Sequence, residues 1–222
     1  MAIVWPCPTS VDTYAALGRG VDVAVPDCPS CAVPMGSWSG YWRTVREGVR
    51  DLRIFVPRAR CSACRTTHAL LPAFCFLRRL HDAATIAAVV EEVVGGPDGV
   101  RPAARRHGVV HETARGWVRR FRSRAGEIAA GFAALSVELG GEVVTPLADA
   151  GRYGLAAIRA SFEVATTLPG WAVLGWSRFV AVVSGGALLS ANTTSPYLVI
   201  GRRRFMPPVP DRDDENGGEH GP

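Results

Sequence analysis

The sequence predicts a mainly α-helical protein with a small β zinc ribbon, in which the ribbon is followed by a helix-turn-helix domain and then by a C-terminal helical region. Three observations lead to this fold class: two Cys-x-x-Cys pairs enclose a strand-like stretch, a helix–Gly–helix pattern follows, and helical periodicity dominates the last third. The expected division is an N-terminal brace (1–27), the zinc ribbon (28–72), the helix-turn-helix (80–126), the C-terminal helical region (127–206) and a disordered tail (207–222).

Four cysteines predict a metal site. Cys28 and Cys31 form the first pair, and Cys61 and Cys64 form the second. A two-residue spacer lets both thiolates of a pair turn onto one ion, and two pairs complete a tetrahedral four-sulfur site that suits Zn²⁺. Disulfides would require an exported chain, yet the N-terminus has no charged n-region and no long apolar run. A thioredoxin-like redox pair would need a βαβ context and would leave the second pair unexplained.

Three further side chains bear on this site. His68 lies four residues beyond Cys64 and could replace one sulfur, but we expect it to be a neighbour of the metal rather than a ligand. Cys75 stands in an apolar Phe-Cys-Phe run and is expected to be a small core residue. Cys7 could be a surplus thiol close to the metal, and the sequence leaves its role open.

The basic residues are all arginine, 25 in number, and they are concentrated in the middle of the chain. Residues 40–126 carry a net charge of +10, against −2 for residues 1–39 and −3 for residues 127–222. Such a concentration creates an attractive field for polyanions. A solvated charged surface is the plainer interpretation, but the coincidence with the cysteine motif favours a nucleic acid.

Between the cysteine pairs we expect a β-hairpin. Residues 44–46 and 52–56 read as its strands, Glu47-Gly48 supplies the turn, and Pro57 is expected to end the second strand. Arginines on one face of this ribbon would be available to phosphates. Those expected to contact DNA are Arg43, Arg46 and Arg53.

Three aromatic residues, Trp38, Tyr41 and Trp42, precede the first strand. Their rings could stack on nucleic-acid bases. A small metal-binding domain, however, needs large apolar residues for its own core, so we expect these three to be buried.

Helix signals are local. A helix is expected over residues 11–17, with Ser10 or Asp12 as its cap, and another over about 82–94, ended by Gly95-Gly96-Pro97.

The pattern of a helix-turn-helix follows. Pro102 suits the first turn of a short helix, Gly108 supplies the tight turn, and a second helix is expected over about 111–124. Ala104 is small enough to let the two helices cross closely, and Trp117 is expected to face the core. In this motif the second helix enters the major groove.

The solvent face of that second helix is what DNA would meet. Arg115 and Arg119 fall one helical turn apart, and arginine matches guanine O6 and N7 or phosphate oxygens. A helical hairpin with a solvated arginine face is the plainer alternative. The residues expected to contact DNA from this helix are His111, Glu112, Thr113, Arg115, Arg119 and Arg120.

Seven runs carry a resemblance to known proteins: Trp5–Pro8, Cys28–Cys31, Gly40–Arg43, Pro57–Cys61, Thr67–Pro72, Thr113–Phe121 and Gly201–Pro210. Through them most of the chain resembles an actinobacterial family of uncharacterised proteins that combine a zinc ribbon with a helix-turn-helix. About residues 28–125 are also similar to the N-terminal DNA-recognition region of insertion-sequence transposases. The resemblance implies zinc binding by the four cysteines and DNA contact by the second helix.

The likeness to transposases stops before their catalytic part. Such enzymes need three metal-binding carboxylates on an RNase H-like core. The acidic residues Glu138, Glu142, Asp149 and Glu163 lack the alternating strands and helices that would position them, so we expect no enzymatic activity.

In the same region we expect helices over 127–139 and 152–168. Residues 173–191 are expected to form a buried helix or helical hairpin, because Arg178 within this apolar stretch argues against a membrane span.

The sequence therefore predicts a non-enzymatic, zinc-dependent, sequence-specific double-stranded DNA-binding protein of the bacterial cytoplasm, associated with the nucleoid and not with a membrane. Its role would be mobile-element DNA recognition or transcription regulation, as a homodimer or with a transposition or transcription protein. The alternative is an accessory or degenerate transposase component that recruits a partner enzyme through its C-terminal region. A third hypothesis is an RNA-binding zinc ribbon whose helices are only a scaffold.

Overall fold

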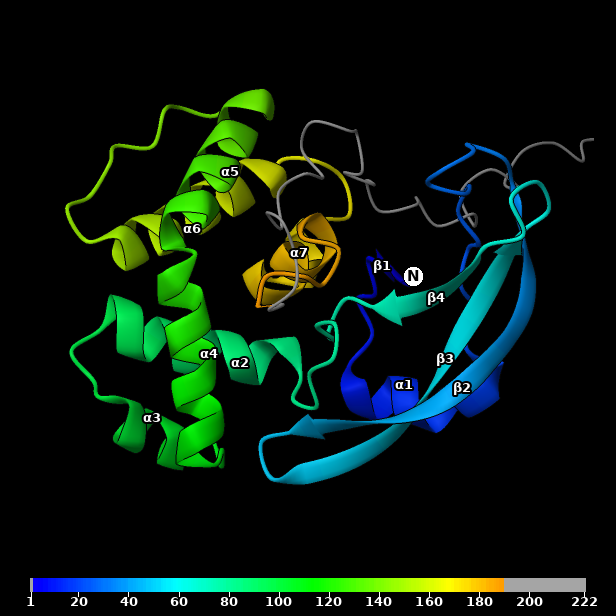
Figure 1. The fold of residues 1–222 in the computed structure, drawn as a ribbon, viewed down its shortest axis with the longest axis horizontal. Helices are drawn as coiled ribbons and strands as arrows, with labels where there is room; N and C mark the ends of the chain where they lie inside the picture. The colour runs from blue at the N-terminus through cyan, green and yellow to red at the C-terminus, as the bar shows by residue number, and fades with distance from the viewer. Residues whose placement is uncertain (1, 190–222) are drawn as a thin grey trace, which may run out of the picture.

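A computed structural model describes residues 2–189 (Figure 1). The expected disordered tail, the arginine run at 202–204 and the end of the expected C-terminal helical region lie outside the described residues.

The described part is a mixed α/β structure of seven α-helices and a four-stranded sheet. It is therefore less dominated by helices than expected, and its sheet extends beyond a ribbon hairpin. In chain order the elements are β1 (Ala2–Trp5), α1 (Val11–Leu17), β2 (Met35–Glu47), β3 (Arg50–Cys61), β4 (Thr67–Pro72), α2 (Ala83–Val90), α3 (Val100–Arg106), α4 (His111–Ser123), α5 (Ala125–Glu138), α6 (Ala150–Ala165) and α7 (Trp176–Val183). Short 3₁₀ turns at Gly18–Gly20 and Ala172–Leu174, and a π-helical turn at Glu91–Gly95, complete the described elements.

The local helix signals agree with these bounds. The hydroxyl of Ser10 accepts a hydrogen bond from the Thr13 amide and caps α1. The carboxylate of Asp82 accepts from the amides of Ala84 and Thr85 and caps α2, which continues through the π-helical turn to Gly95. Caps of this kind are set within one turn of the chain, which is why the sequence places them well.

The sheet has the strand order β1-β4-β3-β2. β2 and β3 form a long antiparallel hairpin, β4 pairs antiparallel with the end of β3, and β1 pairs parallel with β4, with Ala2 opposite Ala69. β1 was not expected as a strand: four residues are too few to show an alternating pattern, and their partner lies more than sixty residues away. Figure 1 shows the hairpin curving from the sheet toward the helices α2 to α4.

Pro57 does not end the second strand, which continues to Cys61. Pro57 pairs with Gly40 across the hairpin. Two residues earlier, the carbonyl of Phe55 turns away from β2 and accepts a 3.1 Å hydrogen bond from the hydroxyl of Tyr14 in α1. Backbone groups two residues apart on a strand point to the same side, so the missing N–H of Pro57 also faces away from β2. The proline therefore costs the hairpin no hydrogen bond.

Two hydrophobic cores lie along this hairpin. The main core contains Ile54 and Val56 of β3 and extends through all seven helices, whereas a smaller core holds Ala59 and Cys61. Successive side chains of a strand point to opposite faces. The change from even to odd positions means that the two halves of the hairpin bury opposite faces.

The C-terminal helices pack on this main core. α5 and α6 pair with each other, and α7 contacts β1 and α2. The guanidinium of Arg178 in α7 donates to the carbonyls of Cys7, Pro8 and Thr9 at 2.8–3.0 Å, so that it ties the last described helix to the N-terminal segment. As expected, most of the described apolar stretch is buried, from Phe179 to Leu189, but Val173 at its start is exposed. No helix in residues 2–189 is both long and apolar enough to cross a membrane.

Candidate metal centre and helical surface

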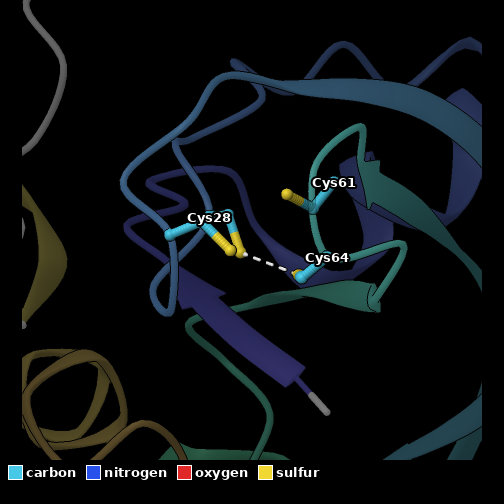
Figure 2. A group of neighbouring side chains, drawn as sticks. Cys28, Cys61 and Cys64 are labelled. Atoms are coloured by element: carbon cyan, nitrogen blue, oxygen red, sulfur yellow. Dashed lines mark hydrogen bonds between the residues drawn. The ribbon is translucent and has the colours of Figure 1, made fainter.

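The four expected cysteines converge on one point. The Sγ atoms of Cys28, Cys31, Cys61 and Cys64 all lie within 4.8 Å of one another, and they are the one such group of potential metal ligands among the described residues. The Cys28 and Cys64 sulfurs are 3.7 Å apart. Zn–S bonds of about 2.3 Å in a tetrahedron place their sulfurs about 3.8 Å apart. Figure 2 shows Cys28 facing the pair Cys61 and Cys64 across a common space.

Two equivalent turns present the sulfurs. The amide of Cys28 donates to the carbonyl of Val33 at 2.9 Å, and the amide of Cys61 donates to the carbonyl of Thr66 at 3.0 Å. In both cases the amide of the first cysteine of a pair is hydrogen-bonded to the carbonyl of the residue five positions later. The same backbone turn is therefore built twice, and each copy turns both of its thiols to one side.

The surroundings of two of these thiols shift their pKa values in opposite directions. Hydrogen bonds from the hydroxyl and amide of Thr66 lower the pKa of Cys64 to about 6. Hydrogen bonding to Cys64 raises the pKa of Cys31 to about 12. A bound cation would displace the remaining protons, because metal ligation requires thiolates.

The residues present fit a soft divalent ion. Four sulfurs at tetrahedral spacing are the donor set typical of a structural zinc site, with no position left open for a substrate. The sulfurs come from two segments, before β2 and at the end of β3, so that a bound ion would join the open end of the hairpin.

The other thiols and His68 lie around this cluster or away from it. His68 is fully buried, and its Nε2 is 4.0 Å from the Cys28 sulfur, which places it beside the four-sulfur group. Cys75 is a buried core residue, as expected, and burial raises the pKa of its thiol to about 12. Cys7 is not near the metal ligands: it is buried in the main core, where desolvation raises its pKa.

The helical surface is built by α3, a turn and α4. Gly108 in the turn has φ +62°, a conformation that glycine adopts without strain, and the amide of Val109 returns to the carbonyl of Ala104 at 2.8 Å. Ala104 and Ala114 are buried where α3 and α4 meet. α4 also packs on α2. Its buried side chains are Ala114, Trp117, Val118 and Phe121.

The opposite face of α4 carries the residues expected to contact DNA. Arg115, Arg119 and Glu112 are exposed, whereas His111, Thr113 and Arg120 are half-buried. Glu112 lies close to two of its neighbours, at 3.3 Å from His111 and 3.6 Å from Arg115.

The hairpin arginines expected to contact DNA differ from one another. Arg43 is half-buried and donates to the carbonyl of Arg79 at 2.5 Å. Arg46 is held in a two-point ion pair with Asp51. Arg53 is exposed, with its guanidinium 5.4 Å from the ring centre of Trp42. Arg43 and Arg46 thus have partners inside the fold, and Arg53 remains at the surface.

The expectation that Trp38, Tyr41 and Trp42 form a core is wrong. Their exposed fractions are 58%, 41% and 38%. The small core is instead made by residues with small or medium side chains, among them Met35, Ala59 and Leu70.

The helix tips and the hairpin tip are in contact. A Cβ on Gly108 would lie 2.5 Å from Val49 Cγ1, and the amide of Gly48 donates to the hydroxyl of Thr85 at 3.3 Å. The hairpin therefore reaches from the cysteine cluster at one end to the α3–α4 turn at the other.

Residues 28–108 match the model of a protein family described as a domain of unknown function (DUF6431). This segment begins at Cys28, the first cysteine of the four-sulfur cluster, and ends at the glycine of the α3–α4 turn, so that it contains the hairpin but not α4. No curated protein and no solved structure matches the chain.

Proposed function

We propose that this protein binds double-stranded DNA in a zinc-dependent, sequence-specific manner, with α3, its turn and α4 acting as a helix-turn-helix. The observation that carries the proposal is the two-sided character of α4: Trp117 and its buried neighbours face α2 and α3, and Arg115 and Arg119 face solvent one turn apart. An α-helix of this kind fits the major groove, where arginine can bond guanine O6 and N7.

The beginning of α4 supports the same orientation. No side chain caps its first turn, and Val110 precedes it with extended backbone. The first N–H groups of a helix attract anions, because they lack partners within the helix and carry the positive end of its dipole. A phosphate at this point would set α4 against the DNA backbone, and the arginines further along would then reach the bases.

The charge of the surrounding surface supports a polyanion. Some arginines of residues 40–126 are engaged within the fold, as with Arg50 and Arg106, which pair with acidic side chains. Besides Arg106, the exposed arginines of α3 and α4 are Arg101, Arg105, Arg115, Arg119 and Arg122. Phosphate contacts from such residues give an affinity that falls steeply with salt.

Zinc would act at a distance in this protein. β3 has 12 residues, so at about 3.3 Å per residue the cysteine end of the hairpin is about 40 Å along the strand from its tip. The ion held by Cys28, Cys31, Cys61 and Cys64 would stabilise the small core and the hairpin. The hairpin tip in turn contacts the α3–α4 turn at Gly108. Loss of the ion is therefore expected to weaken DNA binding through the position of α4.

The test is selection of binding sites from a random duplex DNA pool by the zinc-loaded protein, with and without a chelator. A defined motif that is lost on chelation supports the proposal, and an inverted repeat would indicate a homodimer. The double variant Arg115→Ala/Arg119→Ala should lose the motif, and Arg152→Ala on α6 is the matched control. An unchanged motif in the double variant would exclude α4 as the reader.

A second candidate is the accessory transposition component that recruits an enzyme through its C-terminal region. It is favoured by apolar side chains that stay exposed there, namely Val137, Val143, Leu147, Leu168 and Val173. A recombinase or ATPase gene beside this one would support it. Binding of that enzyme to the wild-type protein, lost in Val137→Ser/Val173→Ser, would be the direct test.

A further inference from the structure

The outer surface of the hairpin near the metal site combines aromatic rings with arginines. Trp38 is 58% exposed and Tyr41 is 41% exposed, although both side chains are large and apolar. Arg58 is exposed and Arg60 is half-buried. These four residues define what we call the hairpin platform.

The register of the hairpin places the platform residues on one face. Tyr41 pairs with Val56, Ser39 with Arg58 and Gly36 with Arg60. Residues at every second position of a strand share a face, so Arg58 and Arg60 lie on the face of Tyr41. Trp38 sits at the irregularity between Ser37 and Ser39, and its ring lies 4.6 Å from the Arg60 guanidinium.

This face changes its character along the hairpin. Ile54 and Val56 cover the main core at one end, whereas Arg58 and Arg60 occupy the equivalent positions beyond Pro57. The small core lies on the opposite face, behind Ala59 and Cys61. The platform is therefore backed by the hairpin and the metal-site core, and its rings are not needed to fill either core.

The platform is open and basic. A Cβ built on Gly36 meets no atom within 4 Å. Neither residues 28–46 nor residues 52–81 include an aspartate or glutamate, so that strongly basic sequence surrounds the rings. A ligand that fits must offer planar groups for the rings and negative charge for the arginines.

We propose that the hairpin platform binds single-stranded nucleic acid, with bases stacked on Trp38 and Tyr41 and phosphates held by Arg58 and Arg60. Stacking of bases on exposed aromatic rings beside arginines is how many proteins hold single strands. A duplex hides the faces of its bases, so this platform selects an unpaired strand. The site is separate from α4 and does not depend on the proposed reading of double-stranded DNA.

The platform is tested with the full, zinc-loaded chain and fluorescein-labelled oligo(dT) and oligo(rU) of about 12 nucleotides. Trp38→Ala should weaken binding of the single strand by about 5- to 150-fold, the range for loss of one stacked base. Trp38→Phe keeps a ring and should recover much of the affinity. Arg58→Ala should lower the slope of log affinity against log salt by about 0.7.

Two controls separate the platform from other effects. Arg152→Ala removes one positive charge from α6 and should leave the affinity for single strands near that of the wild type. A duplex carrying the selected motif should bind Trp38→Ala as well as it binds the wild type, because α4 is untouched. Comparison of oligo(dT) with oligo(rU) decides between DNA and RNA as the strand. No binding of either oligonucleotide by the wild type, or equal binding by Trp38→Ala, would overturn the proposal and leave the platform to a protein partner.

Discussion

Ala32 and Arg65 occupy equivalent places in the two cysteine turns: each directly follows the second cysteine of its pair, and each has left-handed backbone, with φ of 54° and 61°. Non-glycine residues adopt this conformation at a cost of about 1–2 kcal/mol. Each turn thus has the same type of backbone hydrogen bond and a strained residue at the same place. Because this strain occurs at the same position in both turns, we infer that the turns are maintained to hold the four thiols in their arrangement.

Relief of this strain should stabilise the metal site. Ala32→Gly removes one methyl group from a residue with positive φ, and we expect a gain of up to about 1 kcal/mol after the entropy cost of glycine in the unfolded chain. Ala63→Gly, between Cys61 and Cys64 but without positive φ, should instead destabilise. Thermal unfolding of the zinc-loaded protein measures both. A loss of stability in both variants would contradict the interpretation of strain.

Removal of one ligand should release the ion. In Cys61→Ser, three thiolates and a hydroxyl replace the four-sulfur set, and we expect the tightly bound zinc and the fold of residues 28–68 to be lost. Metal analysis after dialysis and circular dichroism measure the two effects. Cys75→Ala is the matched control, because it lowers stability through the main core while one zinc per chain remains bound. One zinc per chain retained by Cys61→Ser would refute the four-thiolate site.

The contact between the hairpin tip and the α3–α4 turn should be measurable as a coupling. Gly108→Ala adds a Cβ 2.5 Å from Val49 Cγ1 and forces alanine into φ +62°, so we expect a loss of more than about 1 kcal/mol. In a Val49→Ala background the steric part is removed and the loss should be smaller. Urea denaturation of the four proteins gives the interaction free energy. Gly126→Ala, at an open position of α5, should stabilise by about 0.5–1 kcal/mol.

Glu92 should stabilise the α3 region in a pH-dependent way. Burial works to raise the pKa of its carboxyl, but hydrogen bonds from His107 and Arg106 lower it below the usual value. Asp98 also faces Arg106 and shares this cation. A lowered pKa in the folded state means that the contribution is present above the unfolded pKa of about 4.3 and is lost as the pH falls through the folded value.

The Glu92→Gln variant should accordingly be less stable than the wild type at pH 7, with a difference that shrinks below about pH 4. Urea denaturation at a series of pH values measures it. Glu127→Gln is a suitable control, because Glu127 is more exposed and its contact with Arg124 is 3.4 Å long. A difference that is the same at all pH values would show that Glu92 acts through its shape and not through its charge.

Much of the candidate site could be predicted because its signals are local. The spacing of the four cysteines brings each pair onto one side of a turn, and the structure gathers the two pairs. Ser10 and Asp82 cap the helices that they precede, and Gly108 takes the left-handed backbone that ends α3. In each case the deciding contacts lie within five residues of the chain, so the identity of a residue and its near neighbours is enough.

The contacts between distant segments were decided by the tertiary structure alone. β1 becomes a strand only because β4 offers it an edge, and Arg43 donates to the carbonyl of Arg79, which lies 36 residues further along the chain. The exposure of Trp38 is the sharpest case. A tryptophan is a large apolar residue, and its identity favours burial. The rest of the chain, however, decides which face of the twisted hairpin is covered. Here that packing covers opposite faces at the two ends and leaves the ring in solvent.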